Sequence, residues 1–336
     1  MEQTDKAFIT LADGSMNEIV SNSFSGNEDT NIDGAIFSRE DLTLNGSGTL
    51  KFTSSAHDIV SRDDLVLTGG VYQIESEKQG LSGKESVRIV DGTFTITSGT
   101  DAIRSEDTDE DTKGFVYIAG GVLTLNAAGG NDQSSMGRPG ENTFQEDSDA
   151  YINILGGMIE IDAKGDGIDS NGDLSVSGGV IYVSGSGDDG NGALDYDGTA
   201  IITGGTVVAA GMSGMAQNFG SDSTQGTMLI NLDTDQSGEV ALKDTDGTVL
   251  VSYTPIRDFN SVVISCAELK EGAAYTLTTG SESEEITMSS LIYSEGQSMQ
   301  GPGQGGPGMD GQNGNPEIWR SFAFYLSGLI IHCMVC

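Results

Sequence analysis

The chain has 336 residues, of which 51 are acidic and 15 are basic, so its formal net charge is -36. Such a charge repels nucleic acid and anionic membranes, and we exclude both as partners. There are 49 glycines but only 5 prolines, a ratio that suits many tight turns better than a Pro-rich disordered chain. Helix signals are scarce and short alternating runs of Thr, Val, Ile and Ser are common, which predicts an all-β protein.

The residue types that several catalytic mechanisms need are nearly absent. His57 and His332 are the two histidines, which leaves little for a Ser-His-Asp or Cys-His mechanism. Cys266 lies in an apolar run and is expected to be a buried thiol. The pair Cys333 and Cys336 cannot complete a four-cysteine zinc site without a second pair. We therefore assign no catalytic residue from the sequence.

The first residues, MEQTDKAFITLADG, lack the basic and apolar regions of a signal peptide. The sequence is thus expected to be either a cytoplasmic protein or a fragment or mature form of a longer one. From residue 33 onward a repeat is visible. Its first landmark is a small residue followed by an apolar one, and the apolar members fall at positions 36, 59, 81, 103, 168, 194 and 215.

The second landmark is a short strand, a corner that contains glycine and another short strand. Its copies are LVLTGGVYQI (65–74), VRIVDGTFTI (87–96), VYIAGGVLTL (116–125), INILGGMIEI (152–161), LSVSGGVIYV (174–183) and AIITGGTVVA (200–209). Apolar residues alternate on each side of the corner, as they do in strands with one inward face. A repeat near 22 residues with two or three short strands is about one turn of a parallel β-helix. We predict eight or so such coils within residues 1–217.

Two segments interrupt the repeat, and the chain changes character near its end. Residues 105–114 form an acidic loop, and residues 129–150 are expected to leave the helix wall. Strand-like runs without the repeat follow from 218 to 294, which predicts an antiparallel β end domain that covers the open end of the solenoid. Residues 295–336 are predicted to be a low-complexity Gly, Pro and Gln tail with a short apolar end, whose role is open.

Acidic turns of successive coils carry the best functional signal. Stacked coils place equivalent carboxylates about 5 Å apart, where they repel one another unless a cation lies among them. Oxygen ligands of this kind, together with backbone carbonyls near the many glycines, suit Ca2+. The predicted metal ligands are Asp166, Asp169, Asp188, Asp189, Asp195 and Asp197. The simpler alternative is a solvated acidic edge.

The segments DGIDSNGDL, NGALDYDG, ITGGT and SGMAQ together resemble those of Ca2+-binding, right-handed β-helix proteins known as carbohydrate-binding domain-containing proteins. The resemblance covers roughly residues 33 to 290. It implies a fold similar to that of family 9 pectate lyases, and an extracellular or cell-surface protein that binds plant cell-wall polysaccharide such as polygalacturonate, pectin or cellulose. The family's Ca2+ pocket corresponds to Asp166, Asp169, Asp188 and Asp189.

A lyase is an alternative function, because pectate lysis combines Ca2+ with a basic residue that removes a proton. There is no Lys or Arg between Lys164 and Lys243, which favours binding without catalysis. Lys164, Arg138 and Lys113 are the nearest upstream bases. A purely structural or adhesive β-helix is the third alternative. Aromatic rings stack on sugars, so the predicted carbohydrate-binding residues are Tyr151, Tyr182 and Tyr196, although each could equally be an ordinary outward-facing strand residue.

Overall fold

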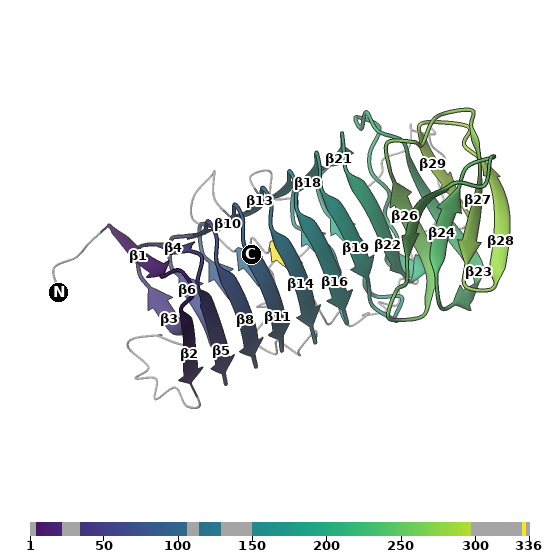
Figure 1. Ribbon diagram of the computed structural model, residues 1–336. Coiled ribbons are helices and arrows are strands. Elements are labelled where there is room, and N and C mark those ends of the chain that lie inside the picture. The colour runs from purple at the N-terminus through teal and green to yellow at the C-terminus, as the bar shows by residue number, and fades with distance from the viewer. Residues whose placement is uncertain (1–4, 22–33, 106–113, 129–149, 297–330, 334–336) are drawn as a thin grey trace, which may run out of the picture.

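The computed structural model describes residues 5–21, 34–105, 114–128, 150–296 and 331–333 (Figure 1). Lys113, Arg138 and most of the predicted tail lie outside these residues. Within them, no helix has both the length and the apolar character that a membrane-spanning segment requires. The described chain is almost entirely β-strand, with one short 3-10 helix, η2 (Ser213–Met215).

Eight successive coils stack into a parallel β-helix with three walls, as the stack of arrows in Figure 1 shows. Sheet A contains, in spatial order, β1 (Lys6–Leu11), β4 (Asp41–Gly46), β7 (Asp64–Leu67), β10 (Ser86–Ile89), β13 (Phe115–Ile118), β15 (Tyr151–Ile154), β18 (Asp173–Val176) and β21 (Ala200–Ile202). The helical part of sheet B contains β2 (Met16–Ser21), β5 (Thr49–Ser54), β8 (Val71–Ser76), β11 (Thr93–Ser98), β14 (Val122–Ala127), β16 (Met158–Ala163), β19 (Val180–Ser184) and β22 (Thr206–Gly211). Sheet C contains β3 (Gly34–Ser38), β6 (His57–Ser61), β9 (Leu81–Gly83), β12 (Ile103–Ser105), β30 (Ile331–Cys333), β17 (Ile168–Ser170) and β20 (Leu194–Tyr196).

The register of the coils follows the sequence repeat. Ile59 pairs with Leu81, and Leu81 pairs with Ile103, on neighbouring parallel strands of sheet C. Ile168 likewise pairs with Leu194. The apolar landmark of the repeat is therefore one ladder of buried side chains along the axis, and the predicted parallel β-helix is confirmed.

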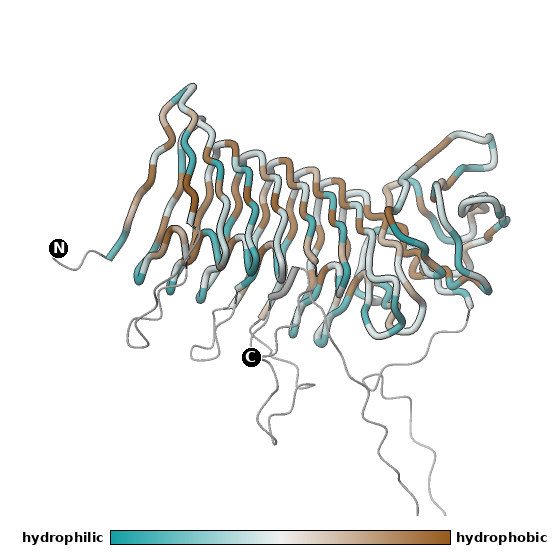
Figure 2. The backbone as a smooth tube through the Cα atoms, turned by 90° about the horizontal axis from the view of Figure 1, so that it is seen from below, coloured by the Kyte–Doolittle hydropathy of each residue, from teal (hydrophilic) through white to brown (hydrophobic). Residues whose placement is uncertain are grey.

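Alternating residues of every wall point inward and fill the solenoid. In sheet B, for example, Phe52, Ile74 and Ile96 stack in register and are at most 1% exposed. Tyr72 and Phe94 stack in the neighbouring inward ladder, with their ring centroids 4.8 Å apart. Each fully buried side chain of this kind contributes roughly 1.5–3 kcal/mol of transfer free energy. Figure 2 shows the resulting alternation of apolar and polar residues around each coil.

Glycine pairs form the corner between sheets A and B. The second glycine of each pair has a positive φ, for example 96° at Gly121 and 100° at Gly157, a conformation that other residues adopt only with strain. A Cβ added at Gly157 would also lie 3.0 Å from the carbonyl oxygen of Gly121 in the preceding coil. The glycines thus allow the stacked corners to approach closely.

Sheet C includes one strand from a distant part of the sequence. At the level of the coil that contains β13 and β14, the strand that lies between β12 and β17 is β30. Backbone pairing places His332 beside Arg104 on one side and beside Asp169 on the other. The sequence pattern does not predict that residues 331–333 pair with these strands.

An end domain follows the last coil (Figure 1). Sheet B continues beyond β22 through antiparallel β26 (Phe259–Ser265), then β23 (Thr227–Gln236) and β29 (Ile292–Glu295). A separate antiparallel sheet D contains β25 (Val249–Tyr253), β24 (Val240–Lys243), β27 (Ala274–Thr279) and β28 (Glu282–Thr287). A second hydrophobic core joins these strands to the outer face of β22 through Val208 and Ala210. Cys266 belongs to this core and is a buried free thiol.

Candidate functional site

Two consecutive described strands of sheet C, β17 and β20, position the predicted acidic cluster. Each follows a glycine-rich acidic turn and begins with a buried apolar residue, Ile168 or Leu194. The next residues, Asp169 and Asp195, pair with each other across the two parallel strands. The repeat thus converts a sequence separation of 26 residues into neighbouring positions on one wall.

Asp166 lies in the turn that leads into β17 and joins the same cluster. Its Oδ1 accepts a hydrogen bond of 2.6 Å from the backbone N–H of Gly192, in the turn of the next coil. Asp166 and Asp169 are each 6% exposed, and Asp195 is partly buried. Three carboxyl groups are therefore held close together and largely out of water.

The electrostatic effect of this arrangement is large. Burial, with the charges of Asp169 and Asp195 next in importance, raises the pKa of Asp166 well above its usual value. Burial raises the pKa of Asp169 to about 8. Burial, followed by the charge of Asp169, raises the pKa of Asp195 to about 7. The charged forms of all three groups are costly in the described fold.

The other three predicted ligands lie at the edge of the cluster. Asp188 is exposed, and its carboxylate is fixed within its own turn by Asn191 Nδ2 at 2.6 Å and Ser186 Oγ at 2.8 Å. Its charge still contributes to the raised pKa of Asp166. The exposed Asp197 contributes to the raised pKa of Asp195. Asp189 is exposed as well, and no interaction joins its carboxylate to the cluster among the described residues.

The donor chemistry of the cluster fits a hard cation. Asp166, Asp169 and Asp195 supply carboxylate oxygens, which are the ligands that hard cations prefer. Within the described residues, Asp166 and Asp195 form no ion pair with a basic side chain. A cation among these groups would oppose the burial that raises all three pKa values and the repulsion that adds to it for Asp166 and Asp195. The oxygens are more widely spaced than in a closed site, because no three of these residues offer oxygens all within 4.8 Å of one another.

The three predicted sugar-binding tyrosines do not form one site. Tyr151 lies on sheet A, Tyr182 on sheet B and Tyr196 on sheet C. Tyr182 stacks on Tyr253 of the end domain, with centroids 4.8 Å apart, at the edge of the second core. Tyr196 packs against the main core and donates a hydrogen bond to the carbonyl of Asn218, and burial raises its pKa to about 12. Tyr151 stacks on Phe115, with ring centroids 4.6 Å apart. All three tyrosines are partly buried and engaged in packing.

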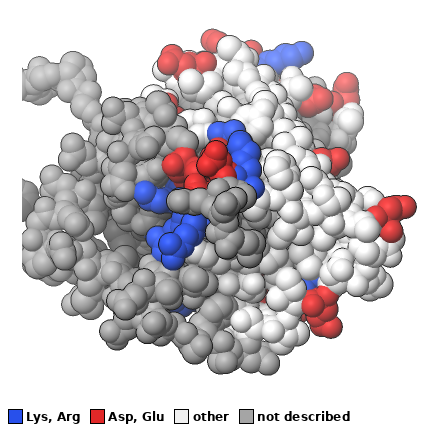
Figure 3. All heavy atoms as spheres, turned by 90° about the vertical axis from the view of Figure 1, so that its left-hand side faces the viewer, with Lys and Arg blue, Asp and Glu red and all other residues white. Residues whose placement is uncertain are grey.

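Sequence reasoning did not identify a second acidic group on the outer face of sheet A. Asp41, Asp63 and Asp64 offer oxygens that all lie within 4.8 Å of one another, the one such trio among the described residues. This trio is paired with cations: Lys6 Nζ lies 2.7 Å from Asp41, and Arg88 lies 3.7 Å from Asp64. Figure 3, which looks onto the N-terminal end of the stack, shows acidic and basic side chains lying together there. The 23-residue offset between Asp41 and Asp64 was the available signal.

Sequence reasoning also missed a basic residue beside the coils of the acidic cluster. Arg257, from the end domain, donates to the carboxylate of Asp162 and to the backbone carbonyl of Ala163. It also reaches the carbonyls of Ser184 and Gly185 in the next coil. The interval between Lys164 and Lys243 lacks basic residues, but the fold brings one in from outside it. Its hydrogen bonds to one carboxylate and three carbonyls fasten the end domain to two coils of the β-helix, and we call this set of bonds the Arg257 clamp.

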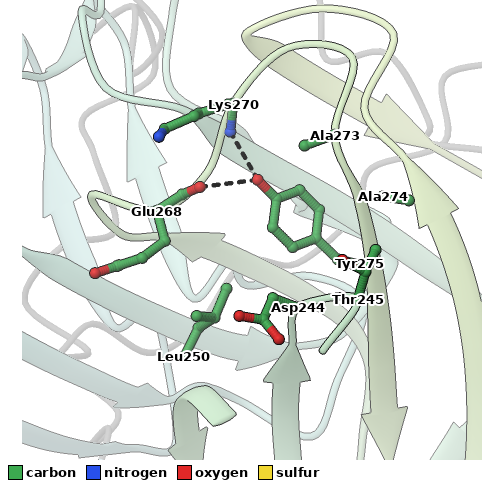
Figure 4. A pocket seen from close by; sticks show the side chains of 8 residues that line it. All are labelled: Asp244, Thr245, Leu250, Glu268, Lys270, Ala273, Ala274 and Tyr275. Atoms are coloured by element: carbon green, nitrogen blue, oxygen red, sulfur yellow. Dashed lines mark hydrogen bonds between the residues drawn. The ribbon is translucent and has the colours of Figure 1, made fainter. Parts of the chain in front are cut away.

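A separate pocket of about 360 Å³ lies in the end domain (Figure 4). Tyr275 forms one wall, and its hydroxyl accepts from the backbone N–H of Lys270 and donates to the carbonyl of Glu268. Figure 4 shows the charged ends of Glu268 and Lys270 directed away from the ring. Asp244, which also lines the pocket, caps the β24–β25 turn by accepting from the backbone N–H groups of Asp246 and Thr248. The Tyr275 hydroxyl and the Asp244 carboxylate are therefore occupied by hydrogen bonds within the end domain.

Comparison with known proteins gives a partial match. A family model described as "Carbohydrate-binding domain-containing protein" matches residues 1–136, a shorter stretch than the resemblance seen in the sequence. The matched residues include sheet A up to β13 and exclude the acidic cluster of sheet C. The family match supports a carbohydrate-related function for the chain. No curated protein matches.

One similar solved structure is that of a polysaccharide lyase-like protein from C. thermocellum, as a gadolinium derivative. It is 28% identical and has a TM-score of 0.38, and the match covers 59% of this chain and 65% of that chain. This chain thus matches less than two thirds of that protein. The fold assignment rests on the sheet topology of this chain.

Proposed function

We propose that this protein binds plant cell-wall polysaccharide outside the cell, with Ca2+ held by the acidic cluster of sheet C, and that it does not cleave its ligand. The observation that carries the calcium proposal is the grouping of Asp166, Asp169 and Asp195, which are largely buried and have raised pKa values. The family match over residues 1–136 supports the carbohydrate proposal.

Asp166, Asp169 and Asp195 are the residues that would hold the ion, with Asp188 at the edge. Ca2+ supplies a positive charge that can also attract the carboxylate of a uronic acid. Such a bridge would let a protein with a formal charge of -36 bind an anionic polymer such as polygalacturonate. The chain's own contribution is to hold the carboxylates in place by strand register and by the Gly192 N–H bond.

Lysis is the second candidate, and the position of the basic residues weighs against it. The coils that bear the acidic cluster contain no Lys or Arg from residue 165 to 242. Lys164 is exposed, and Arg257 is bonded to Asp162 and backbone carbonyls. No described basic side chain is therefore placed over the cluster to remove a proton from a bound sugar. A purely structural β-helix is the third candidate.

The test is a pull-down of the protein with insoluble pectin or cellulose, in Ca2+ and in excess chelator, with the wild type and Asp169→Asn. The proposal predicts retention of the wild type on pectin in Ca2+ and loss of retention in chelator or with Asp169→Asn. Assay of the supernatant for unsaturated sugar separates binding from lysis. Equal retention in both solutions by a protein that stays folded would reject the role of calcium. Retention by neither polysaccharide would favour a structural role.

A further inference from the structure

The last coil of sheet C ends in an edge strand. β20 is the final strand of that sheet, and β17 is its neighbour on one side only among the described strands. At the same end of the solenoid, sheet B continues into β26, and the backbone of β21 in sheet A bonds the loop at residues 220–225. β20 carries Asp195, one of the three carboxyl groups of the acidic cluster. The position of this carboxyl group therefore depends on what holds the edge of β20.

The side chain of Gln217 occupies this edge. Its Oε1 accepts a hydrogen bond of 2.9 Å from the backbone N–H of Tyr196, and its Nε2 donates one of 3.3 Å to the carbonyl of the same residue. One residue of an edge strand presents this same pair of groups, an N–H and a C=O, to a neighbouring parallel strand. A single side-chain amide thus takes the place of a further strand beside β20.

Gln217 holds the residue that directly follows Asp195. On the other side of Asp195, Leu194 is 2% exposed and packs in the main core. The backbone that bears Asp195 is therefore fixed at both of its neighbours, which limits the directions that the carboxylate can take near Asp169. Groups that hold a metal ligand in position matter nearly as much as the ligand, and their loss typically lowers affinity roughly 10- to 100-fold.

The same glutamine ends the segment SGMAQ (213–217), one of the four segments on which the family resemblance rests. The backbone N–H of Ser213 donates to Asn260 Oδ1 of β26 at 2.7 Å. Gly214 packs so closely against the acidic turn of the last coil that an added Cβ would lie 2.4 Å from the carbonyl oxygen of Asp189. The segment thus connects the end domain to the acidic turn and places its glutamine beside β20.

The next residue, Asn218, fastens this segment to two strands of the end domain. Its Oδ1 accepts from the hydroxyl of Thr227 in β23 at 2.8 Å, and its Nδ2 donates to the carbonyl of Tyr293 in β29 at 2.7 Å. Its own carbonyl accepts from the hydroxyl of Tyr196. β20 is therefore tied to this segment twice, through the backbone and through the side chain of Tyr196. A preorganised ion site needs rigid support of this kind.

We infer that Gln217 is a positioning residue of the calcium site, whose amide holds the edge strand β20 so that Asp195 stays within reach of the ion. In this role Gln217 acts through the backbone of Tyr196 and not as a ligand. The inference rests on the proposed calcium site. It gives the end domain a part in calcium binding in addition to covering the last coil.

The experiment is a calorimetric titration of Ca2+ into the full chain and into Gln217→Met, which keeps the length of the side chain and removes both hydrogen bonds. We expect the variant to bind Ca2+ roughly tenfold more weakly. Gln225→Met is the matched control, because the Gln225 amide also caps this end of the solenoid but bonds the Gly205 carbonyl and the Ser265 hydroxyl, away from β20. The control is expected to bind Ca2+ as the wild type does. Circular dichroism and the urea midpoint in chelator check the fold of each variant.

The comparison of affinity with stability separates positioning from a purely structural role. A purely structural residue would lower the urea midpoint in chelator and leave the Ca2+ affinity of the folded protein unchanged. If Gln217→Met does not fold, Tyr196→Phe serves as the second variant. It loses the bond to the Asn218 carbonyl, and weaker Ca2+ binding than in the wild type is expected.

The inference alone is overturned if the wild type binds Ca2+ and Asp169→Asn does not, while Gln217→Met is folded and binds as tightly as Gln225→Met. Wild-type affinity in Tyr196→Phe has the same meaning where that variant is the one used. Failure of the wild type to bind Ca2+, or binding that Asp169→Asn leaves intact, would overturn the proposed calcium site and this inference with it.

Discussion

Asp169 of β17 and Asp195 of β20 stand opposite each other on parallel strands, and burial, followed by the charge of Asp169, raises the pKa of Asp195. The strand register makes the two residues neighbours on one wall and limits how far their carboxylates can separate. The fold thus tolerates a repulsion that a cation can relieve.

Replacement of either carboxylate should weaken calcium binding. We expect Asp169→Asn and Asp195→Asn to lower Ca2+ affinity at least tenfold, because each removes a charged oxygen ligand from the cluster. The measurement is the increase in the free energy of unfolding on adding Ca2+. For the wild type this increase should reach roughly 2.7 kcal/mol at a Ca2+ concentration a hundred times the Kd. Asp91→Asn, in an exposed turn of another coil, should show the full wild-type shift. A full shift in the two cluster variants would place the ion elsewhere.

Calcium binding should release protons near neutral pH. The pKa values of Asp169 and Asp195 are raised to about 8 and about 7, so at pH 6 both groups hold protons that Ca2+ must displace. The affinity is therefore expected to rise as pH increases from 6 to 8. Calorimetry in two buffers with different ionisation enthalpies measures the number of protons released. Absence of any buffer dependence at pH 6.5 would show that the carboxyl groups are already ionised.

Asp58 should make the fold sensitive to pH at a position far from the cluster in sequence. Its side chain is fully buried, and neither carboxylate oxygen has a hydrogen-bond partner in the part of the chain that the structure describes. Burial, followed by the charge of Glu75, raises its pKa to about 7. Because the folded pKa is above the unfolded value of about 3.9, the folded state favours the proton. Stability is thus lost as pH rises from about 4 to about 7, and is constant above that range.

Asp58→Ala removes this penalty. Gly80 and Ala102 occupy the equivalent ladder position in the next two coils, so a small side chain is compatible with the site. We expect the variant to be more stable than the wild type at pH 8, by at most roughly 4 kcal/mol, and the difference to shrink toward pH 5. Urea unfolding at pH 5.5, 6.5 and 8 tests this. A difference that does not change with pH would mean that Asp58 stays in one protonation state.

Arg257 should be a main fastening of the end domain to the helix. Its guanidinium bonds one carboxylate and the carbonyls of two successive coils. Bonds to charged groups contribute roughly 1.5–3 kcal/mol, so Arg257→Ala is expected to lower the free energy of unfolding by about that amount. Lys270→Ala, which removes an exposed side chain of the same domain, is the control and should change it little. Equal effects of the two variants would show that the clamp carries no stability.

The repeat made most of the fold predictable. Apolar residues every 22 or so positions, such as Ile59, Leu81 and Ile103, predicted the ladder that the structure contains. The strand–corner–strand copies predicted sheets A and B, because a positive-φ glycine ends one alternating run and starts the next. The repeat could not predict the pairing of a strand that lies outside the repeat, such as β30 between β12 and β17.

The candidate site was predictable in part for the same reason. Asp166, Asp169 and Asp195 fall at fixed positions of the repeat, so their proximity follows from the register. Sequence could not show that Arg88, Phe115 and Tyr151 stack on one another, because these contacts join three different strands. It could not show Arg257 either, because a contact over 95 residues depends on how the end domain folds back.

The most direct test of the central claim is a calorimetric titration of polygalacturonate into the protein, first with Ca2+ and then with excess chelator, with ultraviolet absorbance followed for unsaturated product. The account predicts heat of binding in Ca2+, its loss in chelator, and no growth of absorbance. Equal heat in both solutions, from protein shown to be folded in each, would contradict the role of calcium. A growing absorbance would contradict binding without cleavage.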